Sequence, residues 1–297
     1  MRNLAVWVVL GLTVARPAWA DDLPEVKSRA AVAIDAATGA EIFGKDADEI
    51  RPIASTTKIF VAMAVRQKGI ELDGWTEITR TDAKASRGGS RTRLDVGQKF
   101  RNKDLLRAML MASDNRAPTA LGRAVGLEPD ELIQEMNKVA KKLALKRTKF
   151  TDTSGLRGNV STAREMAIAL RAALEDDVLR GIMHEQTAEI VSKDRYARIT
   201  YGTTNQPLVS KRYDVVGGKT GYTKPAGYCF VTAVKFDNRE VVMAFLGAGE
   251  KLTRFGDFNR VAGWIDRGAP GAKIVTKRPK RATPRLDVET RGRVAAP

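Results

Sequence analysis

The hydrophobic pattern along the chain predicts a β-hairpin near its beginning. Residues 30–36 are Ala-Ala-Val-Ala-Ile-Asp-Ala, and the turn residues Thr38 and Gly39 separate them from the short segment 41–43. Two such runs joined by a glycine-containing turn are typical of paired antiparallel strands. A sheet is therefore expected to begin close to residue 30.

A helical region is predicted to follow this hairpin. Residues 52–65 are apolar on nearly every side once past Ser55, as in a helix that is buried on all faces. Most segments between 103 and 174 also favour helix, and the clearest is 130–143, with Pro129 near its start, where a first-turn proline is well placed. One face of that helix is formed by Leu132, Met136, Val139 and Leu143.

The pattern changes to β structure after Gly218. Segments 228–234 and 240–246 are rich in β-branched and aromatic residues, and the turn residues Asp237 and Asn238 lie between them, which predicts a second hairpin. An amphipathic helix is expected over 253–265. The chain thus leaves a sheet and returns to it. This predicts an α/β (α+β) fold, an antiparallel sheet flanked by helices, with a mostly helical subdomain inserted at roughly 80–175.

The first twenty residues have the layout of a secretory signal peptide. Arg2 precedes an apolar run over 4–14, and Ala18-Trp19-Ala20 stands before Asp21. The run is shorter than the ~20 residues that span a bilayer, so a retained membrane anchor is the weaker alternative. The mature chain is expected to begin at Asp21 and to be soluble outside the inner membrane, in the periplasm or associated with the cell wall.

The chain is strongly basic. Its formal charge of +16 becomes +14 once Arg2 and Arg16 leave with the signal peptide. Residues 269–297 combine clustered Lys and Arg with several prolines, which predicts a flexible basic tail. In an exported protein the tail is expected to make peripheral contact with anionic wall or membrane, and nucleic acid is not an expected partner. Charge kept for solubility is an equally good explanation.

Two residue counts exclude several chemistries. Cys229 is the only cysteine, so no intramolecular disulfide forms, and its apolar surroundings indicate a buried structural thiol. His184 is the only histidine, which excludes a multi-histidine zinc site. It lies in a polar, helix-like stretch, where a solvent-facing residue is a better interpretation than a member of a Ser-His-Asp triad.

Ser55 and Lys58 are the first candidates for catalysis. They are three residues apart, so a helix places both on one face, where the lysine is within reach of the serine hydroxyl. A neutral lysine could act as the base that a serine nucleophile needs, provided that burial and a second cation lower its pKa. A helix-capping serine and a surface lysine would produce the same spacing, so the pair alone is a weak signal.

Two further motifs make the signal specific. Ser113-Asp114-Asn115 follows an apolar helical run, and Lys219-Thr220-Gly221 lies at the entrance to the C-terminal hairpin. With the Ser55/Lys58 pair, in this order, they form the motif set of penicillin-binding proteins and class A β-lactamases. The chain here resembles the low-molecular-mass penicillin-binding proteins of the D-alanyl-D-alanine peptidase family, over about residues 30–265. Segments 150–156 and 159–163 are similar to the family's middle segment, and 219–229 to its third strand.

The resemblance implies a DD-peptidase/β-lactamase-like fold with a catalytic domain over 21–268. It implies that Ser55 attacks the scissile carbonyl, that Lys58 accepts the hydroxyl proton, and that Ser113 and Lys219 relay it to the leaving amine. Asn115 would hold the substrate amide, Lys219 and Thr220 would bind its terminal carboxylate, and Gly221 would let the strand approach the substrate closely. The backbone N–H groups of Ser55 and Tyr222 would form the oxyanion hole. No metal or organic cofactor is implied, because protein groups supply every role.

The implied substrates are D-alanyl-D-alanine stem peptides or cross-links of peptidoglycan, with β-lactam antibiotics as covalent inhibitors. Class A β-lactamases place a glutamate four residues before an asparagine between the second and third motifs, whereas here those positions are Ile133, Gly155 and Tyr201. The β-lactamase alternative is therefore weaker. A wall-binding protein without catalysis is also weaker, since Ser55 and Lys58 are both present.

Two peptidase activities remain open after the motifs are compared. A D-Ala-D-Ala carboxypeptidase releases the terminal residue, and an endopeptidase cuts a cross-link with the same catalytic groups. Residues 86–91, the short domain plan and segment 249–264 look more like the small periplasmic endopeptidases. The carboxypeptidase is the broader expectation and the endopeptidase is the alternative.

Overall fold

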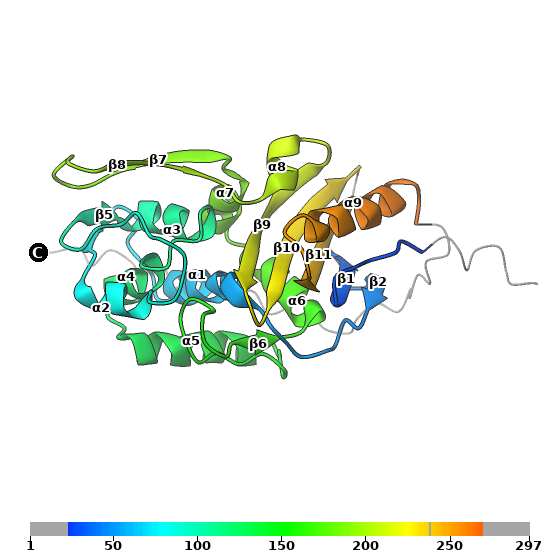
Figure 1. Cartoon of the computed structure of the whole chain (residues 1–297), viewed down its shortest axis with the longest axis horizontal. Helices are drawn as coiled ribbons and strands as arrows, with labels where there is room; N and C mark the ends of the chain where they lie inside the picture. The colour runs from blue at the N-terminus through cyan, green and yellow to red at the C-terminus, as the bar shows by residue number, and fades with distance from the viewer. Residues whose placement is uncertain (1–22, 238, 270–297) are drawn as a thin grey trace, which may run out of the picture.

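The largest sheet of the structure joins the two ends of the folded chain (Figure 1). The computed structural model describes residues 23–237 and 239–269. The strand order is β2-β1-β11-β10-β9, and every neighbouring pair is antiparallel. The five strands are β1 (Ala30–Asp35), β2 (Glu41–Lys45), β9 (Asp214–Thr223), β10 (Gly227–Phe236) and β11 (Arg239–Ala248). Both predicted hairpins are confirmed, and β9 is an edge strand.

The chain between β2 and β9 is mainly helical, and short strand pairs lie between the helices. The helical elements are η1 (Ala54–Thr57), α1 (Lys58–Gln67), α2 (Arg80–Ala85), α3 (Asn102–Leu110), α4 (Ala117–Ala124), α5 (Pro129–Lys142), α6 (Ala163–Ala173), α7 (Asp177–His184) and α8 (Gln206–Ser210). The antiparallel pairs are β3 (Arg51–Pro52) with β6 (Val160–Ser161), β4 (Trp75–Glu77) with β5 (Lys99–Arg101), and β7 (Thr187–Val191) with β8 (Arg198–Gly202). The last helix, α9 (Thr253–Asp266), follows β11.

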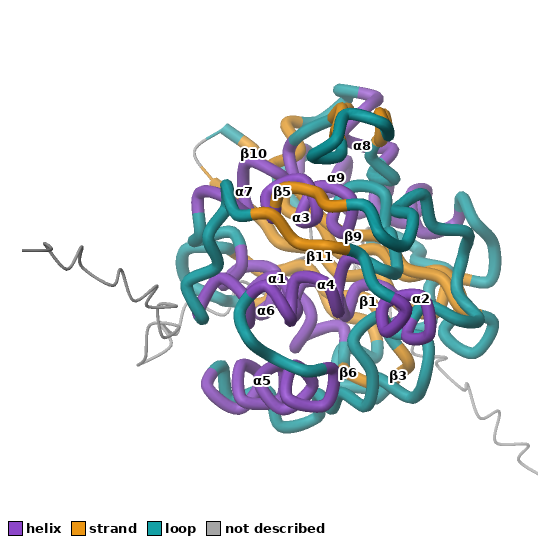
Figure 2. Tube along the Cα trace, turned by 90° about the vertical axis from the view of Figure 1, so that its left-hand side faces the viewer, coloured by secondary structure: helices purple, strands orange, loops and turns teal. Residues whose placement is uncertain are grey.

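Helices cover both faces of the large sheet (Figure 1, Figure 2). Along β11, Val242 and Ala244 belong to a core shared with α1 and α6, whereas Val241 and Met243 belong to a second core shared with α9. Successive residues of a strand point to opposite faces, so a strand covered on both sides is apolar at every position. This is why segment 240–246 shows no alternation of apolar and polar residues.

Two element boundaries differ from the sequence predictions. The α-helix expected over 52–65 begins only at Lys58: Pro52 lies in β3, Ala54 has a left-handed φ of 47°, and residues 54–57 form the 3-10 turn η1. From Lys58 to Val65 every residue of α1 is buried, as predicted. The C-terminal β structure begins before Gly218, at Asp214, since β9 is a complete strand.

Helix α5 agrees with its prediction. Pro129 is in the first turn, and the four residues of the predicted apolar face are all buried. Some predictions lie outside the described residues: the signal peptide over 1–20, the turn residue Asn238 and the basic tail beyond Ala269. In the described part of the chain, no helix has the length and apolar character needed to cross a membrane.

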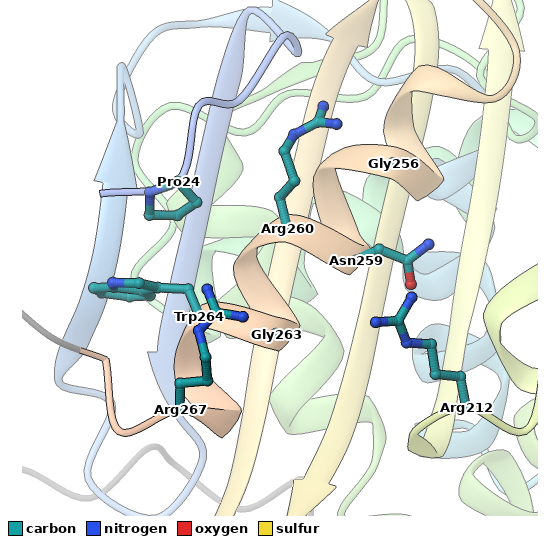
Figure 3. Close-up of a pocket in the computed structure, with 8 residues that line it drawn as sticks. All are labelled: Pro24, Arg212, Gly256, Asn259, Arg260, Gly263, Trp264 and Arg267. Atoms are coloured by element: carbon teal, nitrogen blue, oxygen red, sulfur yellow. The ribbon is translucent and has the colours of Figure 1, made fainter. Parts of the chain in front are cut away.

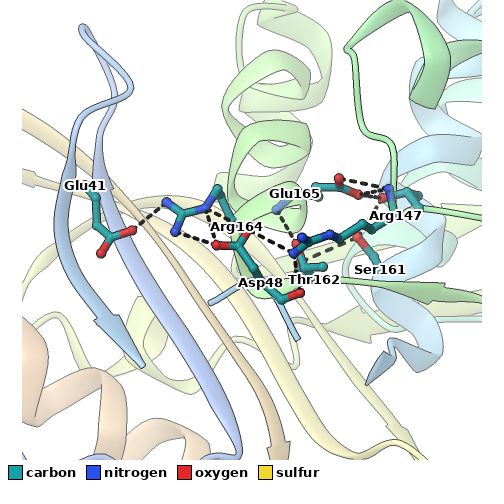
Figure 4. A network of polar contacts seen from close by, with 8 residues as sticks. Glu41, Asp48, Arg147, Ser161, Thr162, Arg164 and Glu165 are labelled. Atoms are coloured by element: carbon teal, nitrogen blue, oxygen red, sulfur yellow. Dashed lines mark hydrogen bonds and ion pairs between the residues drawn. The ribbon is translucent and has the colours of Figure 1, made fainter. Parts of the chain in front are cut away.

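A polar network connects the edge of the sheet to helix α6 (Figure 4). The Arg164 guanidinium donates to both carboxylate oxygens of Asp48, at 3.0 and 2.9 Å, and also to the Glu41 carboxylate. The hydrogen bond from Arg164 lowers the pKa of the Asp48 carboxyl below its usual value. Glu165 accepts the backbone N–H of Arg147 at 3.0 Å. The network therefore fixes the start of the segment that leads from α5 to α6.

A buried carboxylate on α9 holds the N-terminal segment against that helix. Asp257 accepts the backbone N–H groups of Lys27 at 2.9 Å and Ser28 at 2.7 Å, accepts the Ser28 hydroxyl at 2.5 Å, and pairs with Arg260. All of these donors lose their acceptor if the carboxylate is removed, and unsatisfied buried groups are costly.

We expect Asp257→Ala to lower the free energy of unfolding by about 3 kcal/mol, measured by urea denaturation. Asp266→Ala is the matched control, because Asp266 is exposed on the same helix and should change stability by no more than about 0.5 kcal/mol. Equal effects of the two substitutions would contradict the assignment of Asp257 as the group that holds residues 27 and 28.

Candidate active site

Ser55 and Lys58 are in direct contact where η1 runs into α1. The Lys58 Nζ donates to the Ser55 Oγ at 2.9 Å, to the Asn115 Oδ1 at 2.7 Å and to the Ser154 carbonyl at 3.1 Å. Ser55 is half-buried, and its hydroxyl donates to the same Ser154 carbonyl at 3.4 Å. The three-residue spacing thus gives the contact expected for one helix face, and the surface-lysine interpretation of Lys58 is wrong.

Burial dominates the protonation of Lys58. The side chain is 0% exposed, and burial lowers the pKa of Lys58 to about 7, although the charges of Asp114 and Asp152 act in the opposite direction. An ammonium buried away from water loses its hydration, which favours the neutral form. Near neutral pH a substantial fraction of Lys58 therefore carries a free lone pair next to the Ser55 hydroxyl.

The segment after α3 places Asn115 beside Lys58. The Asp114 carboxylate accepts the Arg93 N–H at 3.0 Å, the Arg116 N–H at 2.9 Å and the Tyr201 hydroxyl at 3.1 Å, which fixes the turn. Burial, followed by the charge of Asp114, raises the pKa of Tyr201, so this hydroxyl remains a donor. The turn directs the Asn115 carbonyl oxygen to Lys58.

Ser113 has an unusual position in the same turn. Its backbone φ is 65°, in the left-handed region, and its Oγ is buried without a hydrogen-bond partner among the described residues. A buried hydroxyl without a partner is unfavourable, and such groups and such backbone angles concentrate at functional sites. The Ser113 hydroxyl is therefore available to a bound molecule.

Strand β9 supplies Lys219, Thr220 and Gly221 at the edge of the sheet. A Cβ on Gly221 would lie 2.9 Å from the Ser55 backbone nitrogen, so only glycine allows the strand to pass this close to η1. The Lys219 Nζ is buried and donates to the Thr220 carbonyl at 2.8 Å. The hydroxyl oxygens of Thr220 and Thr204 are 2.6 Å apart.

Three cations share this region. Burial, followed by the charges of Lys58 and Arg254, lowers the pKa of Lys219. Arg254, in the first turn of α9, donates from its Nη1 to the Gly221 carbonyl at 3.0 Å and is itself buried. Burial therefore disfavours the positive forms of Lys58 and Lys219, and an anionic group on a molecule that binds there would favour them again.

A loop between α5 and α6 positions the Ser154 carbonyl. The Asp152 carboxylate accepts the backbone N–H groups of residues 154–157 at 2.6 to 3.2 Å. Asn159 donates to the Asp152 carbonyl at 2.8 Å and to the Thr57 hydroxyl at 3.1 Å. At Gly155, with a φ of +82°, the loop passes so close to η1 that a Cβ would lie 1.9 Å from the Ala54 carbonyl oxygen.

The remaining candidates are placed as follows. The exposed Tyr222 side chain stacks on Tyr228 at 4.2 Å between ring centroids, and its backbone continues β9 directly after Gly221. His184 is exposed at the end of α7, with its Nδ1 at 3.0 Å from the Val215 carbonyl. Cys229 is buried, and burial raises its pKa to about 11, which agrees with a structural thiol.

Sequence reasoning missed three groups that the structure adds to the site. Ser154 contributes a backbone carbonyl, which any residue could supply, so no side-chain signal exists for it. Arg254 leaves a weak signal, as a cation in a first helical turn that is followed by Phe255. Thr204 has no neighbouring motif. No cluster of three or more His, Cys, Asp or Glu residues suited to a metal ion occurs in residues 23–237 and 239–269.

The family model of the D-alanyl-D-alanine carboxypeptidases matches residues 17–250. The chain belongs to this family. It is 29% identical to the D-alanyl-D-alanine endopeptidase of Escherichia coli K12, over 87% of this chain and 85% of the relative. It is 30% identical to the D-alanyl-D-alanine endopeptidase of Pseudomonas aeruginosa, over 90% of each chain.

The fold agrees with solved structures of this family of serine peptidases. A mutant of the Streptomyces K15 DD-transpeptidase superimposes with a TM-score of 0.76 and 26% identity, over 82% of this chain and 98% of that one. The expected penicillin-binding fold, an antiparallel sheet flanked by helices, is confirmed.

We expect Gly155→Ala to lower the free energy of unfolding by about 3 kcal/mol more than Gly158→Ala, measured in urea. Both glycines lie in the same loop with positive φ, so both substitutions carry a similar backbone cost of about 1 to 2 kcal/mol. Only the Gly155 Cβ would overlap a backbone oxygen, whereas the Gly158 Cβ would meet the Thr151 Oγ1 at 3.2 Å. Similar losses for the two variants would show that the contact with Ala54 is not tight.

Proposed function

We propose that Ser55 is the nucleophile of a serine D-Ala-D-Ala peptidase and that Lys58 is its base. The observation that carries the proposal is the 2.9 Å hydrogen bond between the Lys58 Nζ and the Ser55 Oγ, together with a Lys58 pKa of about 7. A base with a pKa near the working pH accepts a proton efficiently and is still present in its neutral form. The catalytic unit spans residues 21–268, with its helical part at roughly 80–175.

In the acylation step, Ser55 Oγ forms a bond to the penultimate D-alanine carbonyl carbon while its proton passes to Lys58. The carbon–nitrogen bond then breaks, and the leaving amine receives a proton through Ser113 and Lys219. The unpartnered Ser113 Oγ supports a relay role, because it has an unused donor and acceptor capacity. Water then attacks the ester, which releases the shortened peptide and free Ser55.

The terminal carboxylate of the substrate binds at Lys219 and Thr220. Bringing a carboxylate to Lys219 raises the pKa of Lys219, because an opposite charge stabilises the ammonium form. The positive charges of Lys58 and Lys219 repel each other. A positive Lys219 therefore disfavours a positive Lys58. Substrate binding therefore favours a charged Lys219 and a neutral Lys58, the combination that acylation requires.

The remaining groups orient the substrate. Asn115, held by Lys58 through its carbonyl oxygen, has its amide nitrogen directed toward the Ser90 hydroxyl at 3.4 Å, a weak contact that a substrate carbonyl can replace. The backbone N–H groups of Ser55 and Tyr222 form the oxyanion hole. Gly221 keeps β9 close enough to η1 for both donors to face one oxygen, and the open edge of β9 pairs with the extended peptide.

A β-lactam acylates Ser55 and remains bound. The two carboxylates whose charges act on Lys58 are Asp114 and Asp152, and the oxygens of both accept hydrogen bonds from backbone N–H groups or Tyr201. Neither is free to activate a deacylating water. This agrees with the missing glutamate of the class A β-lactamases and supports a peptidase that β-lactams inhibit.

Carboxypeptidase activity is the main proposal, in line with the family model. Endopeptidase activity on cross-links is the second candidate, because the relatives from Escherichia coli and Pseudomonas aeruginosa are both named endopeptidases. We place the enzyme outside the inner membrane after removal of residues 1–20. The basic segment 269–297 makes peripheral contact with anionic wall or membrane.

We expect the chain to form a covalent adduct with benzylpenicillin that persists for hours in intact-protein mass spectrometry, and Ser55→Ala to form none. The same variant should lose release of D-alanine from monomeric muropeptides and cleavage of cross-linked ones. Preference between these two muropeptides decides between the two activities. An adduct on Ser55→Ala, or rapid turnover of the drug by the wild type, would contradict the proposal.

We expect the rate of acylation by benzylpenicillin to fall about tenfold for each pH unit below about 7 and to level off above it. The reason is the lowered pKa of Lys58: below about 7 the amine is protonated and accepts no proton from Ser55. The acylation rate constant measured from pH 5 to 9 by quenched-flow mass spectrometry tests this, with thermal unfolding at each pH as the control for stability. A flat profile would rule out Lys58 as the base.

A further inference from the structure

A second polar pocket lies on α9, separate from the site around Ser55 (Figure 3). Its volume is about 470 Å³, and its walls are α9, the chain before β9 and the N-terminal segment at Pro24. Three arginines line it, Arg212, Arg260 and Arg267, together with Asn259, and no acidic side chain does. The pocket is therefore a local concentration of positive charge.

The floor of the pocket is formed by α9, at two positions where the helix has glycine and therefore no side chain. Gly256 and Gly263 are seven residues apart, which places them on one face of the helix. A Cβ on Gly256 would lie 3.4 Å from the Arg260 Nη1, and one on Gly263 would lie 3.5 Å from the Arg267 Nη1. The guanidinium groups of Arg260 and Arg267 thus lie next to the glycines, beside the space that side chains at these positions would fill.

Two of the three arginines are not compensated by the protein. Arg260 pairs with Asp257 and donates from its Nε to the Glu25 carbonyl at 2.6 Å. Arg212 and Arg267 are exposed and form no ion pair with any residue in the described ranges; Arg212 lies over the Tyr213 ring at 5.4 Å. Two guanidinium groups without a carboxylate partner and an exposed Asn259 amide thus line one pocket, and guanidinium N–H groups are well suited to phosphate oxygens.

Exposed aliphatic residues adjoin the pocket in sequence. Leu23 precedes Pro24 of the wall and is 54% exposed, Val209 is three residues before Arg212 and is 53% exposed, and Leu252 is four residues before Gly256 and is 62% exposed. Cations next to exposed aliphatic groups are typical of surfaces that contact the headgroup region of a bilayer. A soluble polyanion would gain nothing from the aliphatic groups.

The sequence beyond the pocket adds further positive charge. Ala269 stands two residues after Arg267, and residues 270–297 contain eight Lys or Arg and two Asp or Glu. The pocket lies on the face of the large sheet covered by α9, whereas α1, which carries Lys58, packs against the opposite face. The pocket and the buried Lys58 therefore lie on opposite faces of the sheet.

We propose that this pocket binds the phosphate of an anionic lipid headgroup and seats the protein on a membrane surface. Arg212 and Arg267 contact the phosphate oxygens, Asn259 donates a further hydrogen bond, and Leu23, Val209 and Leu252 enter the interface. The assignment does not depend on the catalytic roles of Ser55 and Lys58.

The test is co-sedimentation of the full chain with vesicles that contain 30 mol% anionic phospholipid. We expect the double variant Arg212→Gln/Arg267→Gln to bind about tenfold more weakly than the wild type, because each cation near an anionic surface contributes severalfold to the partition coefficient. The control is Lys141→Gln/Lys142→Gln, which removes the same formal charge from exposed positions on α5, far from α9 in Figure 1 and Figure 2. It should bind within about twofold of the wild type.

Three outcomes would overturn the proposal. An equal loss for the two double variants would mean that net charge alone drives binding. Undiminished binding to vesicles of zwitterionic phospholipid alone would exclude a requirement for an anionic headgroup. Calorimetric binding of inorganic phosphate, abolished in the Arg212/Arg267 variant and without any vesicle binding, would assign the pocket to a free anion. Thermal unfolding of each variant checks that a loss of binding is not a loss of fold.

Discussion

The site depends on a single constraint, the complete burial of the Lys58 amine in a helix whose other buried side chains are apolar. Removing an ammonium from water costs several kcal/mol, so the group either becomes neutral or acquires acceptors. Here both occur. Its pKa falls to about 7, and its protonated form finds three acceptors: Ser55, Asn115 and the Ser154 carbonyl. A lysine at the surface would keep its proton and could not act as a base.

The three acceptors come from segments far apart in sequence, and carboxylates fix two of these segments. Asp114 binds the turn that presents Asn115, and Asp152 binds the loop that presents Ser154. Both carboxylates raise the pKa of Lys58 through space without touching its amine. Because their oxygens are occupied by N–H and O–H donors, they organise the backbone around Lys58 without forming the direct ion pair that would keep it protonated.

The sequence predicts well those features that depend on the periodicity or the spacing of side chains. The hairpin at 30–36, the apolar face of α5 and the pairing of Ser55 with Lys58 all follow from local pattern. It does not predict where the long helix starts, because Ala54, which has a left-handed φ, packs against Gly155, a residue distant in sequence.

The same limit applies to the part of the site that sequence reasoning missed. The Ser154 carbonyl has no side-chain signature, and the hydrogen bond from Arg254 to the Gly221 carbonyl requires α9 to fold back onto the sheet. Both are consequences of the tertiary fold. Motif spacing identifies the reactive side chains, whereas the groups that tune and position them are backbone atoms or residues brought in from other elements.

Helix α9 contacts both the candidate active site and the basic pocket. Its first turn carries Arg254, which holds the Gly221 carbonyl of the strand beside Ser55, and its last turn precedes Arg267 at the basic pocket. These two arginines are thirteen residues apart, which corresponds to about 20 Å along a helix. A molecule held at Arg267 therefore binds at the other end of α9 from the contact between Arg254 and the Gly221 carbonyl. In the proposed membrane-bound state, the direction of α9 therefore determines how β9, with Lys219 and Gly221, is oriented relative to the membrane.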